Sequence, residues 1–260
     1  AVKSLINQTV LVDDQTVPAA DLSLDEESYG SLAQFAVMCP ATDYWQTTIA
    51  DTVNEIVTRL ETDGVYIDQI AAAGPYPCWD PTHGHPLGGG SHWVDGYKEM
   101  LASAREGAGS EAALMTESNA EPFLEGVDIF LTLVGFQENL ATTSTEHIVP
   151  VFPAIYGGYV YSAGAMFYHS DMDDDSDVFC ARLATQLLYG AQLGWMSLGG
   201  RDNQDPYMGM LDVMMDPAHD DEIEFLRTMS SARSTLTDYF VDGRPTRDLS
   251  VALTSVGVAK

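Results

Sequence analysis

Two short apolar runs that end in a carboxylate decide the fold of this 260-residue chain: GVYID at residues 64–68 and AALMTE at residues 112–117. Each run has the length and composition of a strand buried in a parallel sheet. A segment with helical periodicity precedes the first run, and another lies between the two. This alternation of strands and helices is typical of parallel α/β folds.

The same strand–helix unit recurs along most of the chain. Four more apolar runs follow the pattern: FAVMC (35–39), VDIFLTL (127–133), VPVFPAI (149–155) and QLGWMSL (192–198). Between the runs at 35–39 and 64–68, apolar residues recur every three or four positions and predict a core-facing helix that Gly64 closes. Similar stripes predict helices around Trp93–Ala104, Val178–Leu188 and Ile223–Leu236. We therefore predict six parallel strands joined by helices.

The predicted fold class is α/β, a (β/α)8 TIM barrel that is incomplete. Such a barrel takes about 250 residues, yet the regular rhythm begins only at residue 35. We expect barrel strands 3 to 8 here, with the first two missing or irregular. The predicted domains are an irregular segment over 1–34, the catalytic barrel over 35–245 and the start of a following β domain over 246–260. Further domains of the same polypeptide are expected on both sides.

Charge and composition exclude several classes of function. The chain has 39 Asp and Glu against 11 Lys and Arg, a formal net charge of −28. A nucleic-acid partner would require a basic stripe, and the sequence has no run of Lys or Arg. No apolar run approaches the roughly 18 residues of a membrane span, so no membrane partner is expected. Three widely spaced cysteines, Cys39, Cys78 and Cys180, form neither a disulfide framework nor a recurring zinc motif.

Asp68 and Glu117 are the candidate catalytic residues. Each ends an apolar run, and the carboxyl ends of barrel strands face the mouth where substrates bind. Neighbouring strands lie about 4.8 Å apart, so two carboxyls at the same level should be near 5 Å apart. Retaining glycosidases separate their two carboxylates by about 5–5.5 Å, and inverting enzymes by about 6.5–9.5 Å. The spacing predicts retention; the alternative is that one carboxylate caps a helix or pairs with an arginine.

A long loop after Asp68 supplies most of the candidate substrate-binding residues. It covers residues 69–93, far more than the usual 2 to 6 residues of such loops, and mixes aromatic with polar side chains. The full set of candidates, including two after later strands, is Tyr66, Trp79, Asp80, His83, His85, Trp93, Tyr156 and Arg201. The histidines could instead stabilise the loop, or bind a metal with Cys78 and Asp80, or lie on plain surface. We assign no metal and no cofactor.

Four motifs in order carry a family resemblance: MCPATDYW (38–45), DGVYIDQI (63–70), CWDPTHGHPLGGGSHW (78–93) and LMTESNAEPF (114–123). With them the chain resembles a group of uncharacterised bacterial TIM-barrel proteins classed with glycoside hydrolases, over about Phe35–Gly200. It is more distantly similar to endo-α-N-acetylgalactosaminidases and the α-amylase superfamily. The resemblance implies that Asp68 is the nucleophile and Glu117 the acid/base. Tyr66 stands where the α-amylase signature has an arginine.

The expected function is that of a retaining glycoside hydrolase acting on an α-linked glycan or glycoside. The expected partner is therefore a carbohydrate substrate. An acidic surface and a polymeric substrate favour an extracellular or cell-envelope location. Two other functions stay open: a catalytically silent carbohydrate-binding barrel, and a metal-dependent hydrolase built on Cys78, Asp80 and the loop histidines.

Overall fold

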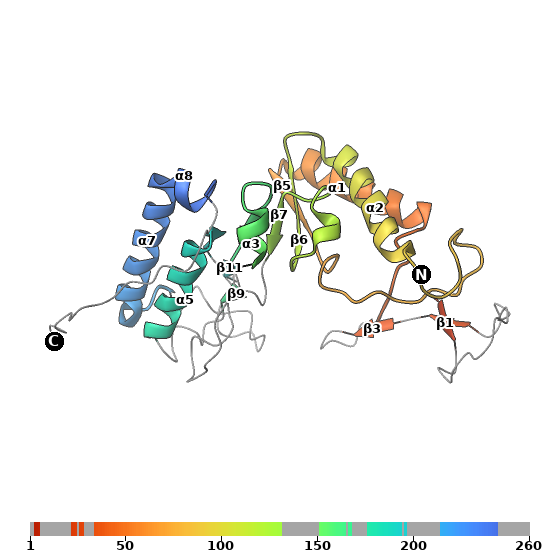
Figure 1. The fold of residues 1–260 in the computed structure, drawn as a ribbon, viewed down its shortest axis with the longest axis horizontal. Helices are drawn as coiled ribbons and strands as arrows, with labels where there is room; N and C mark the ends of the chain where they lie inside the picture. The colour runs from red at the N-terminus through yellow and green to blue at the C-terminus, as the bar shows by residue number, and fades with distance from the viewer. Residues whose placement is uncertain are drawn as a thin grey trace. The chain divides into compact units, whose positions relative to one another are not determined.

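The computed structural model describes residues 3–5, 22–24, 26–28, 34–131, 151–164, 166–167, 176–193, 195–196 and 214–243 (Figure 1). These residues belong to two units, Ala1–Leu131 and Thr132–Lys260. Both units combine helices with strands, which confirms the mixed α/β class. Closure into a TIM barrel and the absence of its first two strands stay predictions, as do the predicted domain boundaries.

Three parallel strands form the sheet of the first unit. They are β5 (Gly64–Ile67), β6 (Ala113–Glu117) and β7 (Ile129–Leu131). Gly64 lies opposite Ala113, and Met115 lies opposite Ile129. A Cβ on Gly64 would lie 2.7 Å from the Ala113 carbonyl oxygen, so only glycine permits this close approach. The strands predicted at 64–68, 112–117 and 127–133 are thereby confirmed with their parallel direction.

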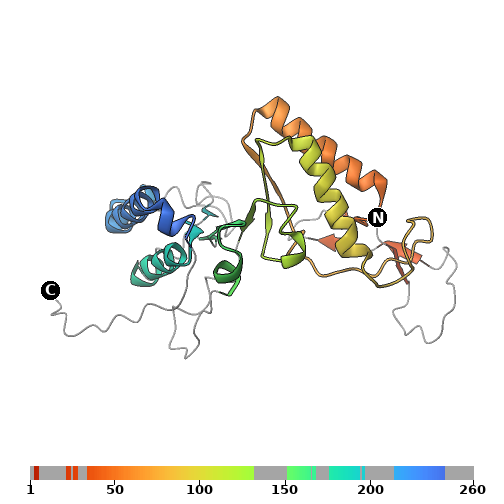
Figure 2. The ribbon, with the colours of Figure 1, turned by 45° about the horizontal axis from the view of Figure 1, so that its top comes forward.

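Two long helices accompany these strands and lie side by side, α1 (Asp43–Leu60) and α2 (His92–Ala108) (Figure 2). Both confirm the helices predicted from apolar periodicity. The helix α1 ends at Glu61, which adopts a left-handed φ of 53°, and not at Gly64 as expected. Because α2 carries Gly107 against the backbone of Ala50, the two helices approach closely at this point.

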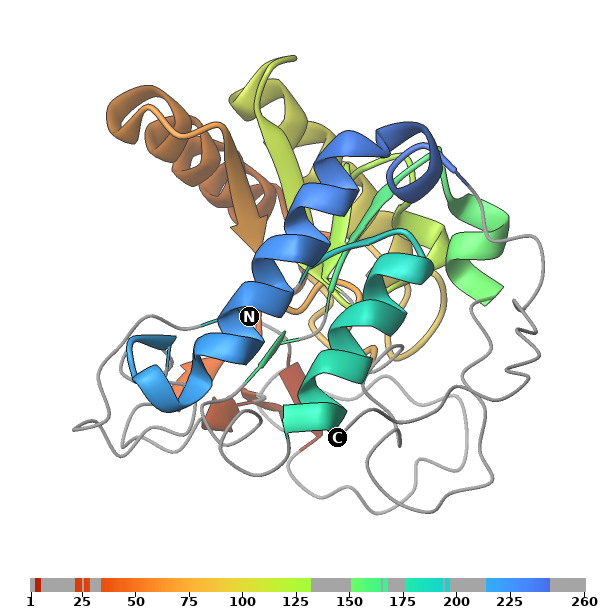
Figure 3. The same cartoon turned by 90° about the vertical axis from the view of Figure 1, so that its left-hand side faces the viewer.

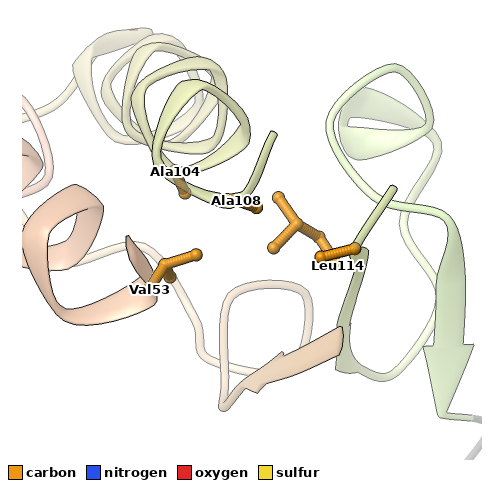
Figure 4. Packing of buried hydrophobic residues seen from close by; sticks show 5 residues of the cluster. Val53, Ala104, Ala108 and Leu114 are labelled. Atoms are coloured by element: carbon orange, nitrogen blue, oxygen red, sulfur yellow. The ribbon is translucent and has the colours of Figure 1, made fainter. Parts of the chain in front are cut away.

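The core of the first unit lies between these helices and one face of the sheet. Val53, Ala104, Ala108 and Leu114 are buried together (Figure 4), and Val65 and Ile67 pack against them. Side chains alternate between the two faces of a strand. The opposite face of the sheet therefore carries Tyr66, Asp68, Met115 and Glu117.

The strand predicted at 35–39 is wrong in its direction and extent. The structure has β4 (Gln34–Ala36), which pairs antiparallel with β3 (Glu26–Ser28). A second antiparallel pair joins β1 (Lys3–Leu5) to β2 (Leu22–Leu24). A short apolar run indicates a strand, but its direction depends on a partner that the run itself does not specify.

The second unit repeats the alternation with shorter strands. Its described elements are α3 (Val151–Tyr156), β8 (Tyr161–Ala163), β9 (Met166–Phe167), α5 (Ser176–Leu188), β10 (Ala191–Gln192), β11 (Trp195–Met196), α7 (Asp220–Thr235) and α8 (Thr237–Phe240). β10 pairs parallel with β8, and β11 with β9. Helices α5 and α7 lie side by side (Figure 3), with Phe179 and Leu183 buried between them.

Two predictions for the second unit need correction. The run at 149–155 was predicted as a strand, but its residues 151–155 belong to the helix α3. Pro153 is compatible with this helix because it lies in the first turn, where the missing N–H is not needed. The run at 192–198 is divided between the two-residue strands β10 and β11. None of the helices among the described residues has the length and hydropathy of a membrane span.

Candidate functional site

The register of β5 and β6 brings the two candidate carboxylates together. Ile67 lies opposite Thr116, so the next residues, Asp68 and Glu117, are neighbours at the carboxyl end of the sheet. Both belong to the face that α1 and α2 do not cover. Asp68 is exposed and Glu117 is half-buried. The pair therefore combines a solvent-accessible carboxylate with a partly desolvated one.

Burial raises the pKa of Glu117 first, and the charge of Asp68 and a hydrogen bond with its carboxylate raise that pKa further. Burial and a neighbouring carboxylate both favour the neutral form of a carboxyl group, which is the direction that a general acid requires. Two neighbouring carboxylates whose environments differ in this way can act as acid and base. The site therefore combines a carboxyl group whose pKa is raised, as in a general acid, with an exposed carboxyl group on the neighbouring strand.

Tyr66 is the third member of the site. Its hydroxyl donates a 2.9 Å hydrogen bond to Asp68 Oδ1. Burial, this hydrogen bond and the charges of Asp68 and Glu117 raise the pKa of Tyr66 well above its usual range, so the phenol keeps its proton. Tyr66 thus contacts the candidate nucleophile, and its predicted contact with substrate stays a prediction.

The backbone is strained directly after both carboxylates. Gln69 has a φ of 65° and Ser118 a φ of 60°, which place two non-glycine residues in the left-handed region. The Ser118 amide donates to the Leu131 carbonyl at 2.7 Å, and the Gln69 carbonyl accepts from Ala73 at 2.8 Å. Such conformations cost about 1–3 kcal/mol each and concentrate at functional sites. Neither residue type signals this conformation in the sequence.

A cavity of about 480 Å³ adjoins Asp68. Its volume lies within the range of small-molecule sites. Three aromatic side chains of its wall contact one another: Trp93 lies 5.5 Å from Tyr76 and 5.2 Å from Tyr97, measured between ring centroids. Trp93 is only 4% exposed and also belongs to the core. Glu117 is not among the residues that line this cavity.

The long loop after Asp68 brings two histidines and a cysteine against a second cysteine from an earlier segment. The ligand atoms of Cys39, Cys78, His83 and His85 all lie within 4.8 Å of one another. Cys39 Sγ is 3.4 Å from His85 Nε2, and Cys78 Sγ is 3.3 Å from His83 Nδ1. Both cysteines are buried. We name these four residues the Cys–His cluster.

Cys78 and the loop histidines were predicted as possible metal ligands, whereas Cys39 was not. Cys39 is 39 positions away from Cys78, so only the fold brings the two thiols together. Contact with Cys78, followed by burial, raises the pKa of the Cys39 thiol.

Neighbouring polar groups hold the two histidines of the cluster. His83 Nε2 lies 3.4 Å from the buried carboxylate of Asp80, and Thr82 donates to that carboxylate through its amide and its hydroxyl. His85 Nδ1 lies 2.8 Å from the Pro86 carbonyl oxygen. These contacts are all within the loop. The expected contacts of Asp80, His83 and His85 with substrate stay predictions.

The remaining candidates lie in different places. Trp79 packs on Gly88, where an added Cβ would be 3.1 Å from the indole ring. Tyr156 ends α3 in the second unit and its ring packs on Phe152. Arg201 lies outside the described residues. None of these three residues has a described contact with Asp68 or Glu117.

Comparison with known proteins shows the family. Residues 9–168, more than half of the chain, match the family described as Domain of unknown function (DUF6259). The chain belongs to this family. No solved structure matches it.

Two curated relatives carry glycosidase names. The chain is 42% identical over 232 residues to "Putative glycoside hydrolase 22789" of Monosiga brevicollis, which covers 87% of this chain and 19% of that protein. It is 32% identical over 232 residues to "Putative glycoside hydrolase" of Bacteroides thetaiotaomicron, with coverage of 89% and 32%. The chain thus spans about a fifth and a third of the lengths of these relatives. Their names support a glycosidase-like function; the bacterial origin of the family and its similarity to the α-amylase superfamily stay predictions.

Proposed function

We propose that this chain carries the catalytic carboxylates of a retaining glycoside hydrolase that acts on an α-linked glycan or glycoside. Asp68 is the nucleophile and Glu117 is the acid/base. The observation that supports the proposal is the position of these two carboxyl groups at the ends of neighbouring parallel strands, where burial and the charge of Asp68 raise the pKa of Glu117. The glycoside hydrolase names of the two relatives agree with this assignment.

In the first step an oxygen of Asp68 attacks the anomeric carbon and forms an ester bond. The bond from that carbon to the leaving oxygen breaks, and the leaving oxygen takes the electron pair and the proton of Glu117. The hydrogen bond from Tyr66 orients the attacking carboxylate. Raising the pKa of Glu117 keeps its proton available at higher pH, which a general acid requires.

In the second step Glu117, now a carboxylate, takes a proton from water. The water oxygen attacks the anomeric carbon and the ester bond to Asp68 breaks, which regenerates both side chains. Two displacements on the same carbon give overall retention of configuration.

The test is a comparison of Asp68→Asn and Glu117→Gln with two matched controls, Asp63→Asn and Glu111→Gln. The control residues are exposed and precede the same two strands at their opposite ends. On a panel of para-nitrophenyl α-glycosides we expect Glu117→Gln to lower kcat/KM by about 10²–10⁴-fold and Asp68→Asn to lower it further. The controls should retain wild-type rates. Full activity of Asp68→Asn would refute the proposal.

Azide separates the two roles. In Glu117→Ala the glycosyl–enzyme has no base to activate water, but the azide anion needs none and should restore turnover by forming a glycosyl azide of retained configuration. The same anion should not restore Asp68→Ala in this way, because without the nucleophile there is no covalent intermediate of the wild-type kind. Formation of a glycosyl azide of retained configuration by both variants would contradict the role assignment.

A silent carbohydrate-binding module is the second candidate, and the aromatic cavity beside Asp68 favours it. The partly buried Tyr76 and Tyr97 in its wall provide aromatic faces of the kind that pack on sugar rings. Calorimetry with a glycan library distinguishes the two functions. Binding of a glycan by wild-type protein without release of reducing sugar would support the binding module against the enzyme.

A further inference from the structure

We propose that Cys39, Cys78, His83 and His85 bind one zinc ion in a closed structural site. This inference does not depend on the proposed glycosidase function. It rests on the four ligand atoms that the fold gathers from two separate segments, within 4.8 Å of one another. Two thiolates and two imidazoles are a common ligand set of structural zinc.

Two of the distances between the ligand atoms are close to those around a tetrahedral ion. Zinc binds sulfur at about 2.3 Å and nitrogen at about 2.0–2.1 Å, so ligand atoms at the corners of a tetrahedron lie about 3.3–3.8 Å apart. The sulfur–nitrogen separations of 3.4 Å between Cys39 and His85 and 3.3 Å between Cys78 and His83 lie within or next to this range. Small adjustments would therefore accommodate the ion.

The surroundings of both histidines have the form expected of metal ligands. A ligating histidine usually donates its second ring N–H to a carboxylate or a backbone carbonyl, which fixes the ring and its tautomer. His83 directs Nδ1 at Cys78 and Nε2 at the buried Asp80 carboxylate. His85 directs Nε2 at Cys39 and Nδ1 at the Pro86 carbonyl. Each ring thus has one nitrogen on the cluster and the other on an oxygen acceptor.

A zinc ion held in this way would stabilise the loop and take no part in hydrolysis. Four protein ligands leave no position for an activated water, in contrast to catalytic zinc sites. The ion would tie residue 39, which precedes α1, to the loop between β5 and α2. Because this loop begins directly after Asp68, the ion would fix the segment that follows the candidate nucleophile.

Metal analysis of the purified protein tests the proposal. We expect the wild type to contain one zinc equivalent more than Cys39→Ser and His83→Gln. The matched controls are Cys180→Ser and His219→Gln, whose residues lie in the second unit outside the cluster. Both controls should retain the full zinc content. Equal zinc contents in the wild type and the cluster variants would overturn the proposal.

X-ray absorption on wild-type protein keeps the test decisive if a cluster variant fails to fold. Two sulfur neighbours at about 2.3 Å and two nitrogen neighbours at about 2.0 Å are expected around zinc. Absence of zinc after refolding with zinc chloride under reducing conditions would refute the site. The site would also be refuted if mass mapping found a Cys39–Cys78 disulfide in protein that was purified with zinc present.

Removal of the ion should also lower stability. Metal binding that accompanies folding contributes to the free energy of unfolding, so a chelator should lower the Tm of the wild type and leave that of Cys39→Ser unchanged. The same chelator should leave Asp68 able to form its covalent intermediate in protein that stays folded. Failure of the zinc proposal is thereby distinguishable from failure of the proposed function.

Discussion

At the scale of single residues, the contact between Tyr66 and Asp68 defines how the candidate nucleophile is held. A hydrogen bond to a charged group contributes about 1.5–3 kcal/mol, so we predict that Tyr66→Phe lowers kcat/KM by about 10–100-fold. Tyr44→Phe is the matched control, since Tyr44 is exposed on α1. Steady-state kinetics on the best aryl glycoside checks this. Equal rates for Tyr66→Phe and the control would show that the bond does not serve the reaction.

The raised pKa of Glu117 predicts how the stability of the protein depends on pH. Its pKa in the folded protein is raised above the ordinary 4.5. Between these two pKa values the native state binds more protons than the unfolded state, so the free energy of unfolding falls as the pH rises. Glu117→Gln removes this loss and can still donate a hydrogen bond to Asp68. We therefore expect the variant to gain Tm relative to wild type at neutral pH but not well below pH 4.5.

Thermal melts at both pH values check the prediction for Glu117. A difference in Tm that is the same at low and neutral pH would show that the carboxyl does not titrate as described. The alkaline limb of kcat/KM should likewise report deprotonation of Glu117 in the wild type and be absent from the residual activity of Glu117→Gln.

Part of the site could be predicted residue by residue. Asp68 and Glu117 stand out because each ends an apolar run, and strand pairing then makes them neighbours. The left-handed Gln69 and Ser118 could not be predicted, since neither residue type favours that conformation. Cys39 could not be assigned to the Cys–His cluster, because its partners are close in space but distant in sequence.

At the scale of elements, the contact between α1 and α2 depends on Gly107. A Cβ at this position would lie 2.5 Å from the Ala50 carbonyl oxygen of α1. The clash is with backbone, so one helix must move, and overpacking of this kind costs about 1–3 kcal/mol. We predict that Gly107→Ala lowers the free energy of unfolding by this amount. Urea denaturation provides the measurement.

The control for Gly107 is Gly74→Ala. An added Cβ there meets no atom within 4 Å, so this variant should unfold at nearly the wild-type urea concentration. An equally small effect of both substitutions would mean that α1 and α2 do not approach as the structure shows.

The predictability of elements follows their length. The helices α1 and α2 have four or more turns of consistent periodicity, and both were predicted. The runs at 35–39 and 149–155 are too short to distinguish a strand from a helix, or a parallel strand from an antiparallel one. The secondary structure and strand direction of such segments depend on their pairing partners and on their position along the chain.

At the scale of the whole molecule, the net charge of −28 predicts a dependence on salt. Repulsion among like charges destabilises the compact state, and at 1 M salt the screening length falls to about 3 Å. We therefore expect the Tm to rise as sodium chloride is increased from low concentration to about 1 M. Sucrose at equal osmolality is the control for effects that do not involve charge. A Tm that does not respond to salt would contradict the prediction.

The most direct test of the central claim is covalent trapping on Asp68. A fluorinated glycosyl fluoride of the sugar that the enzyme accepts should inactivate it by accumulating the glycosyl–enzyme, and peptide mass mapping should locate the label on the peptide that contains Asp68. Label on Asp68 with retained product configuration is the predicted result. Label on another carboxylate, or product of inverted configuration without any label, would contradict the account.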